Sequence, residues 1–310
     1  MLAVKTIKSN SNIFRRAIWL MGNQFEISIV ANDIIWAEAR IANAINEINR
    51  VEKLLSAFSD TGNVTEINRN AGIQPVKVNS EIFWLIDRAI KISELTYGAF
   101  DITYFSGDKE LITANNKATK KATTFGNYQS VVLDDKAMTV FLKEEGMRIS
   151  FAANSKGYAA DRAKYILQTQ GVSSGVINAG GDLLTWGLQP DNQPWTVAAA
   201  DPELQNVAYA GLNISNMCIA TTVNSDENVT ITNKQAVKKI NPKKGFPVSG
   251  IVSMSIVSPS AELSGAMANP MITIGINAGL YLINKLNQIG CVIIDDHQRI
   301  YTSKDISITE

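Results

Sequence analysis

The sequence is poor in residues that commonly carry catalytic and metal chemistry. Its 310 residues include one histidine, His297, and two cysteines, Cys218 and Cys291. The cysteines lie far apart in apolar stretches, which favours two buried free thiols over a disulfide and argues against a zinc site. His297 follows two aspartates in a turn-like stretch, so we expect it at the surface. A mechanism with a histidine base would have to use this residue.

An excess of charge of one sign is also lacking. Lysine plus arginine and aspartate plus glutamate both number 29, so the formal net charge is zero. This balance argues against a duplex nucleic-acid binder, although a local basic pocket could still hold an anionic ligand. No apolar run approaches about 18 residues, and residues 17–21 are too short for a signal peptide. We therefore expect a soluble, cytoplasmic protein without a transmembrane segment as the sequence stands.

The order of the expected elements favours an α+β fold, because helices and hairpins are mixed rather than strictly alternating. Strand and helix periodicities are assigned from apolar spacing. Strands are expected at residues 25–30, 131–133, 138–142, 148–151, 175–178, 195–199, 209–214, 219–222, 252–257 and 291–294, and helices at residues 34–58, 81–95, 158–168, 262–274 and 279–286. Ser80 is the expected cap of the second helix, and residues 106–127 read as a surface loop. Without repeats or a linker, we expect one compact unit of one lobe or two.

Three glycine-containing turns are candidates for chemistry. Ser155-Lys156-Gly157 precedes a helix whose free N–H groups suit a phosphate, or it is an ordinary helix start. Asn178-Ala179-Gly180-Gly181-Asp182 follows an apolar strand, where paired glycines admit a ligand or simply form a tight turn. Residues 238–247 hold four lysines within seven positions. Their positive field could meet a pyrophosphate, or the lysines are only solvated surface.

Taken in order, these turns and four further stretches resemble the FAD:protein FMN transferase (ApbE) family. The resemblance covers about residues 18–300, and the shared order makes it far more specific than any single motif. The matching stretches are Met21-Gly22-Asn23, Leu55-Ser56-Ala57-Phe58, Glu66-Ile67-Asn68, Gly98-Ala99-Phe100-Asp101, Lys156-Gly157-Tyr158-Ala159, Asn178-Ala179-Gly180-Gly181-Asp182 and Ile240-Asn241-Pro242.

The resemblance implies both a fold and an activity. It implies mixed or antiparallel sheets with packed helices, in a flavin-binding domain over residues 18–310 after an N-terminal extension of residues 1–17. It implies phosphoryl transfer of FMN from FAD to a threonine or serine of an acceptor protein, with release of AMP and help from Mg²⁺. Relatives often carry an exported lipoprotein leader, so the resemblance also points to the periplasmic side of the cell envelope.

The resemblance also assigns ligand contacts. Phe58 would stack on a ring, Asp101 would accept hydrogen bonds from a ribose or ring edge, and residues 178–182 would form a wall beside the flavin. The full set of expected FAD contacts is Met21, Phe58, Ala99, Phe100, Asp101, Ser150, Lys156, Asn178, Gly180, Gly181, Asp182 and Ile240.

The sequence departs from the family pattern near the expected chemistry. The strand before Lys156 usually reads D-[FL]-G-G-[IV]-[GA], and here Ser150 stands for the aspartate while alanines stand for both glycines. A metal contact through the Ala153 backbone carbonyl needs no side chain and is retained as an expectation. Lys238 stands where the family has a histidine, which makes it the candidate catalytic residue.

The expected metal pair is altered as well. Gly265 replaces the family's aspartate, and Asn269 replaces its threonine, so Asn269 is the second candidate metal ligand. Glu262 lies about one helical turn earlier and is not expected to reach in. Three interpretations stay open: a working FMN transferase, an impaired flavin-binding paralogue that acts as a carrier or regulator, and a metal-assisted FAD pyrophosphatase.

Overall fold

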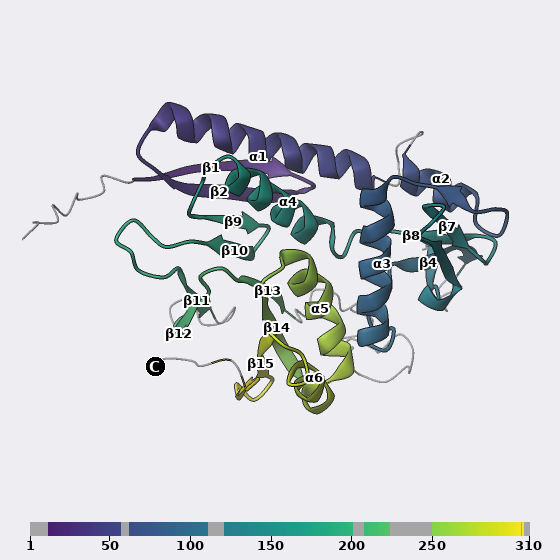
Figure 1. Cartoon of the computed structure of the whole chain (residues 1–310). Helices are drawn as coiled ribbons and strands as arrows, with labels where there is room; N and C mark the ends of the chain where they lie inside the picture. Colours follow the sequence, from purple (N-terminus) through teal and green to yellow (C-terminus); the bar gives the residue numbers. More distant parts are fainter. Residues whose placement is uncertain are drawn as a thin grey trace, which may run out of the picture.

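An eight-stranded antiparallel sheet organises the chain, in a computed structural model that describes residues 12–56, 62–110, 121–200, 208–223, 250–304 and 306 (Figure 1). Within residues 105–110, 121–125, 197–200 and 208–213 only the backbone is described. The strand order is β1 (Asn12–Leu20), β2 (Asn23–Ala31), β9 (Gly175–Ala179), β10 (Asp182–Trp186), β13 (Cys218–Val223), β14 (Ile251–Ser258), β15 (Gly290–Asp295) and β16 (Ile300–Thr302). Each neighbouring pair is antiparallel.

Helices cover one face of this sheet because both surfaces present apolar side chains at matching periods. Phe25, Ile27 and Ile29 alternate along β2 and are fully buried. Long helices then pack across them, with α1 and α4 over one half of the sheet and α5 over the other (Figure 1). The helices are α1 (Ile34–Leu55), α4 (Ser155–Thr169), α5 (Ala261–Ile274) and α6 (Ile276–Ile283).

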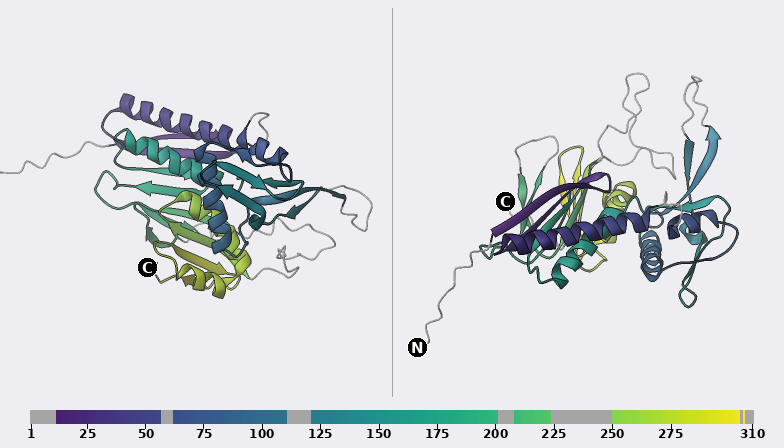
Figure 2. Two further views of the ribbon diagram at one scale, coloured as in Figure 1. Left: turned by 45° about the vertical axis from the view of Figure 1, so that its right-hand side comes forward. Right: turned by 90° about the horizontal axis from the view of Figure 1, so that it is seen from above.

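A second part of the molecule lies at the C-terminal end of α1, which spans both parts (Figure 2). It contains α2 (Asn63–Arg69) and α3 (Ser80–Leu95), with η1 (Tyr128–Ser130). Two small sheets complete it, ordered β3 (Val76–Lys77), β7 (Thr139–Leu142), β6 (Val131–Asp134) and β5 (Lys121–Phe125), β4 (Thr103–Glu110), β8 (Met147–Ile149). A separate hairpin pairs β11 (Thr196–Ala200) with β12 (Ala208–Asn213).

The α+β class predicted from the sequence is confirmed, while several local details differ, among them the strand β10 and the start of α6, which the sequence did not predict. The cap of α3 is Asn79 rather than Ser80, since the Asn79 side chain accepts the Ile82 N–H. Residues 106–110 and 121–125 were predicted as loop but belong to the paired strands β4 and β5. Because this stretch of sequence is polar, it shows no alternation of apolar residues from which strands could be predicted. The expected boundary at residue 18 falls inside β1, which pairs with β2 from Asn12 onward.

The scarce cysteines and histidine lie where the sequence predicts. Cys218 and Cys291 are buried free thiols on β13 and β15, with β14 between them. His297 is exposed in the turn after β15. Among the described residues, no helix combines the length and apolarity needed to cross a bilayer.

Helices α4 and α5 approach so closely that their contact tolerates no side chain at Gly157. A Cβ built on Gly157 would lie only 2.2 Å from the Ala261 carbonyl oxygen. One turn further along α4, the Asp161 carboxylate accepts the N–H groups of Ala261 and Glu262 at 2.9 Å and the Ser260 hydroxyl at 2.8 Å. The start of α5 is therefore fixed against the first turns of α4.

We predict that Gly157→Ala lowers the free energy of unfolding by about 1–3 kcal/mol, because the added methyl group forces the two helices apart. Gly279→Ala in α6 is the matched control, since its Cβ would meet Met271 at an ordinary 3.8 Å. The control should keep or gain stability, by up to about 1 kcal/mol from helix propensity. Urea unfolding of both variants measures the difference, and equal stabilities would contradict the helix contact.

Candidate functional site

The turn between β1 and β2 lies beside the turn between β9 and β10. β2 pairs with β9, so both turns lie at the same end of these neighbouring strands. The Asn23 side chain donates to the Met21 carbonyl at 2.8 Å, and the Gly180 N–H donates to the Gln24 carbonyl at 3.0 Å. A Cβ on Gly180 would lie 3.0 Å from the Asn23 side-chain oxygen. Two predicted ligand contacts, Met21 and Gly180, are thus neighbours.

Glycine is required in the hairpin between β9 and β10. Gly180 and Gly181 have φ angles of 67° and 104°, a left-handed conformation that side chains oppose. The Asn178 side chain accepts the Gly181 N–H at 2.8 Å and stabilises the turn. Asp182 follows as the first residue of β10. The hairpin therefore holds Asp182 at a fixed position at the start of β10, an interior strand of the sheet.

Asp182 meets the start of α4 and the first turns of α5. A Cβ built on Gly265 would lie 3.9 Å from an Asp182 carboxylate oxygen and 3.9 Å from the Ala153 carbonyl oxygen. Lys156, in the first turn of α4, is close enough for its charge to act on Asp182. In Figure 1 these helices begin near the middle of the molecule, beside the ends of β9 and β10. Residues from three distant parts of the chain converge here.

The Asp182 carboxylate is only partly compensated electrostatically. Burial raises its pKa above the ordinary aspartate value, because a charge is disfavoured away from water. The Lys156 ammonium and the Thr221 backbone N–H lower the pKa in part. Burial is the largest of these effects on the Asp182 pKa.

Ser150 joins the loop before α4 to the segment that follows α3. Its N–H donates to the Ile102 carbonyl at 2.8 Å, and its hydroxyl accepts the Ala152 N–H at 3.3 Å. The predicted contacts Ala99 to Asp101 immediately precede Ile102. These residues therefore lie beside the loop that contains Ala153.

Two residues of that segment already have partners in the fold. The Asp101 carboxylate accepts the Thr103 N–H at 2.8 Å, the Thr103 hydroxyl at 2.7 Å and the Tyr128 N–H at 3.0 Å. Phe100 is 4% exposed within the hydrophobic core. Any contact from Phe100 to a ligand would therefore use its backbone, whereas half-buried Ala99 leaves more of its surface accessible.

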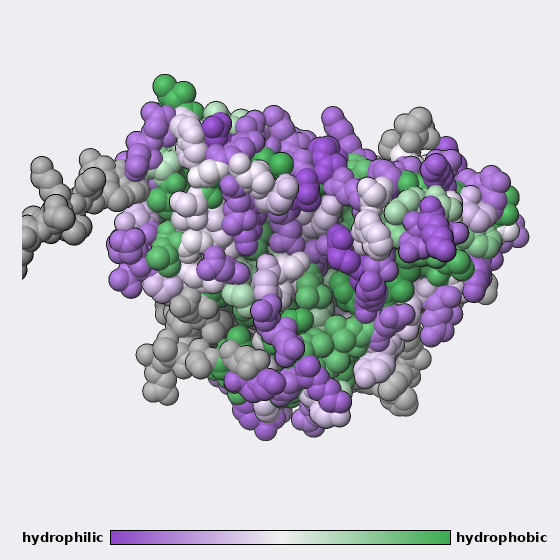
Figure 3. Space-filling view, in the orientation of Figure 1, coloured by the Kyte–Doolittle hydropathy of each residue, from purple (hydrophilic) through white to green (hydrophobic). Residues whose placement is uncertain are grey.

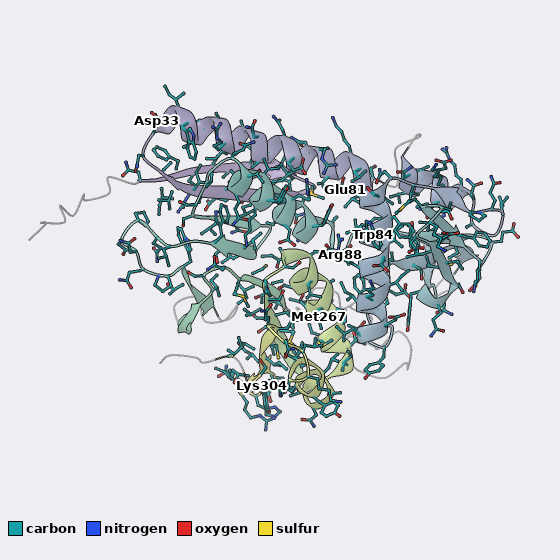
Figure 4. The ribbon with its side chains drawn as sticks, in the orientation of Figure 1. Asp33, Glu81, Trp84, Arg88, Met267 and Lys304 are labelled. Carbon is teal, nitrogen blue, oxygen red and sulfur yellow. The ribbon has the colours of Figure 1, made fainter. Side chains whose placement is uncertain are left out.

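Glu262 does not face Gly265 as a free carboxylate. It is buried and pairs at 2.9 Å with Arg88, which Figure 4 labels on α3. The Arg88 guanidinium also lies over the Tyr158 ring at 5.6 Å. Burial raises the pKa of Glu262, while Arg88 lowers it. Asn269, one turn after Gly265, is exposed. Glu262 is therefore occupied by Arg88, and the role of Asn269 as a metal ligand stays a prediction.

Ion pairs link the helices around the site. Arg50 of α1 pairs with Glu81 of α3 and with Glu47, and Glu47 also pairs with Arg162 of α4. The Tyr158 hydroxyl donates to Glu81 at 2.6 Å, and its pKa is raised by burial and by this bond. The network holds α3 against α4, so the second part of the molecule is fixed relative to the sheet.

Three predicted site residues, Phe58, Lys238 and Ile240, lie outside the described residues. Their roles as ring contact, catalytic group and FAD contact stay predictions. The other predicted residues fall into two adjoining groups, one around Met21, Gly180 and Asp182, the other around residues 99–101 and 150–153.

Some residues at this site were not found from the sequence. Asn154 is 1% exposed, and neither atom of its side-chain amide has a hydrogen-bond partner in the described part of the chain. It stands where the family pattern has isoleucine or valine, so the polar substitution was a usable signal. The Thr221 N–H that donates to Asp182 carries no such signal, because any residue on β13 offers the same group.

Comparison with known proteins agrees with this geometry. The family model described as the ApbE family matches residues 21–293, so the chain belongs to the ApbE family. An FAD:protein FMN transferase of Klebsiella pneumoniae (strain 342) is 25% identical over 307 residues, which cover 95% of this chain and 93% of the relative. Another from Salmonella typhimurium is 24% identical over 257 residues, covering 78% and 73%.

Solved structures share the fold. The ApbE protein of Thermotoga maritima superposes with a TM-score of 0.75 at 21% identity, covering 94% of this chain and 97% of that one. The flavin transferase ApbE of Vibrio cholerae gives a TM-score of 0.74 at 18% identity, covering 95% and 98%. The ApbE-like fold predicted from the sequence is thereby confirmed.

We predict that Arg88→Met lowers the free energy of unfolding by about 2 kcal/mol at neutral pH. A fully buried pair would cost about 3–5 kcal/mol, but the Arg88 side chain is 42% exposed. The variant's Glu262 has a pKa raised further, because the group that lowers it is gone. A protonated Glu262 needs no partner. The loss of unfolding free energy relative to the wild type should therefore be small below pH 4.5 and should grow as the pH rises.

Lys91→Met is the matched control on the same helix. Lys91 is 66% exposed and pairs with Asp87 at 2.7 Å across one turn, so its loss should change stability by less than about 1 kcal/mol. Urea unfolding at several pH values measures both variants. A deficit of Arg88→Met that does not vary with pH would contradict the role given to Glu262.

Proposed function

We propose that this chain is an FAD:protein FMN transferase. Its substrates would be FAD and an acceptor protein that presents a threonine or serine hydroxyl. The observation that supports the proposal is that Asp182 lies near Lys156 and, beside Gly265, near the Ala153 carbonyl, while Gly180 in the preceding turn adjoins the turn that contains Met21. Met21, Lys156 and Asp182 come from separate turns that match the family's motifs in order.

The proposed reaction replaces the phosphoanhydride bond of FAD with a phosphoester bond to the acceptor protein. The acceptor oxygen attacks the phosphorus on the FMN side of the FAD pyrophosphate and forms a new P–O bond. The bridging P–O bond breaks, and AMP leaves with the bridging oxygen. The acceptor hydroxyl gives up its proton, and Lys238 stays the predicted catalytic group. Catalysis then depends mainly on positioning and on compensating phosphate charge.

Lys156 is the described residue best placed to compensate that charge. It lies in the first turn of α4, whose N-cap residue Asn154 makes no side-chain cap hydrogen bond, and the dipole at a helix start favours an anion. Neighbouring Gly157 and Ser155 carry no bulky side chain that would keep a phosphate away from this turn. We assign to Lys156 and the start of α4 the binding of one phosphate of FAD.

A divalent cation, when bound, would neutralise the developing charge on the pyrophosphate oxygens. The Ala153 carbonyl and the Asn269 amide are oxygen donors of the kind Mg²⁺ accepts. The space beside Gly265 adjoins the Ala153 carbonyl and the Asp182 carboxylate, so the residues present fit such an ion.

Incubation of the full chain with FAD, Mg²⁺ and a threonine-bearing acceptor tests the proposal. We expect the acceptor to gain the mass of one FMN phosphoester while AMP appears in equal amount. FAD binding without AMP release would contradict the transferase and favour a flavin carrier or regulator. FMN release without labelling of the acceptor would favour a pyrophosphatase.

We further predict that Lys156→Met weakens FAD binding by roughly ten- to a hundredfold, since one charge-assisted contact is worth about 1.5–3 kcal/mol. Lys136→Met is the control, because Lys136 is exposed in the turn between β6 and β7. Quenching of flavin fluorescence gives both dissociation constants. Equal constants for the two variants would remove Lys156 from the site.

A further inference from the structure

Gly265 leaves an open space on the inner side of α5. Among the described residues, only two heavy atoms outside its own helix and its chain neighbours lie within 4 Å of a Cβ built there. Both are oxygens, the Ala153 carbonyl and an Asp182 carboxylate oxygen, each at 3.9 Å. A side chain at position 265 and the Asp182 side chain would therefore project into the same space.

We propose that Asp182 supplies the carboxylate of a divalent-cation site in this chain, in place of the aspartate that position 265 lacks. The Ala153 carbonyl is the second ligand, and exposed Asn269 lies one helical turn from Gly265 on α5. The cation is a hard one such as Mg²⁺, which accepts a few protein oxygens and keeps several waters. The site deepens the proposed FMN transfer and rests on that function for its role.

The charges around Asp182 favour a cation there. No ion pair within 4 Å is present for the half-buried Asp182 among the described residues. Glu262 differs, because it is buried and has Arg88 at 2.9 Å. Lys156 acts on Asp182 only at longer range, so the carboxylate can still bind an ion.

A second observation marks the same loop as a ligand region. Asn154, directly after Ala153, is 1% exposed, and its amide has no hydrogen-bond partner among the described residues. Buried amides are rarely left unpaired, because each unmet bond costs about 1–3 kcal/mol. The loop that carries the Ala153 carbonyl therefore contains a polar side chain whose hydrogen-bonding capacity is unused.

Another acidic group is a weaker candidate. Asp295, Asp296 and His297 offer ligand atoms within 4.8 Å of one another in the turn after β15. Asp295 already accepts hydrogen bonds from Arg299 and Tyr301, and Asp296 pairs with His297 at 2.7 Å. This group serves as the internal control in the experiment, since it would bind the same probe if the assignment were wrong.

Titration of the full chain with Mn²⁺, followed by electron paramagnetic resonance of the free ion, tests the site without FAD or acceptor. We expect one Mn²⁺ per chain, displaced by Mg²⁺. Asp182→Asn should weaken Mn²⁺ binding at least tenfold, whereas Asp296→Asn should leave it unchanged. Absence of binding, or loss in Asp296→Asn instead of Asp182→Asn, would overturn the proposal.

Gly265→Asp keeps the proposal testable if Asp182→Asn does not fold. The added carboxylate would face Asp182, so the variant should unfold at a lower temperature without metal and recover with Mg²⁺. It should also bind Mn²⁺ at least tenfold more tightly than the wild type. Gly265→Asn is the uncharged control of equal size and should show neither effect. Equal behaviour of these two variants would place the cation elsewhere.

The experiments distinguish a failure of the proposed cation site from a failure of the proposed FMN transfer. Mn²⁺ binding that depends on Asp182, in a chain that transfers no FMN, would contradict the transferase and leave the cation site in place. FMN transfer with an unchanged Mg²⁺ requirement in Asp182→Asn would contradict the site and leave the transferase in place.

Discussion

The close contact between α4 and α5 is the constraint on which the candidate site depends. Gly157 lets the Ala261 carbonyl approach, and the Asp161 carboxylate holds the first N–H groups of α5. The Asp161 contact satisfies donors that a helix start leaves free. It also fixes the distance between the loop before α4 and the inner face of α5. Ala153 and Gly265, far apart in the sequence, become neighbours for this reason.

Three buried or half-buried carboxylates around this contact are compensated in different ways. Asp161 is compensated by backbone N–H groups and a hydroxyl, and Glu262 by the Arg88 guanidinium. Asp182 has one backbone N–H and a more distant lysine. In each case burial raises the pKa, so the partner decides whether the charge is tolerated. The least compensated carboxylate is also the one that borders the open space beside Gly265.

The surface around α5 differs from its surroundings. In Figure 3, hydrophobic residues gather in the hollow where α5 lies, between hydrophilic regions on the helices above and below it. The sequence of α5 explains this, because most of its residues are apolar and the helix has one basic or acidic side chain, Glu262, which is paired. Charged groups near the site come instead from α3, α4 and β10.

Much of the fold could be predicted from the sequence. Apolar spacing located the helices α1, α3, α4 and α5 to within a few residues, because burial of one face requires that spacing. The strand β1 was missed, since only one of its nine residues is buried and its apolar residues, interrupted by Arg15 and Arg16, do not alternate with polar ones. Motif order identified the family, and the family model confirmed it.

Some features of the candidate site follow from the sequence, and others follow only from the tertiary structure. The sequence by itself determined the residue types: glycines at 180 and 181 that permit a left-handed turn, a lysine at a helix start, and a missing carboxylate at 265. Only the tertiary structure decided that Asp182 faces Gly265 and that Glu262 forms an ion pair with Arg88. It also decided that the Asn154 side chain is buried with no hydrogen-bond partner among the described residues. Local sequence restricts backbone angles and periodicity, whereas these pairings depend on how close separate elements pack, which no short stretch of sequence encodes.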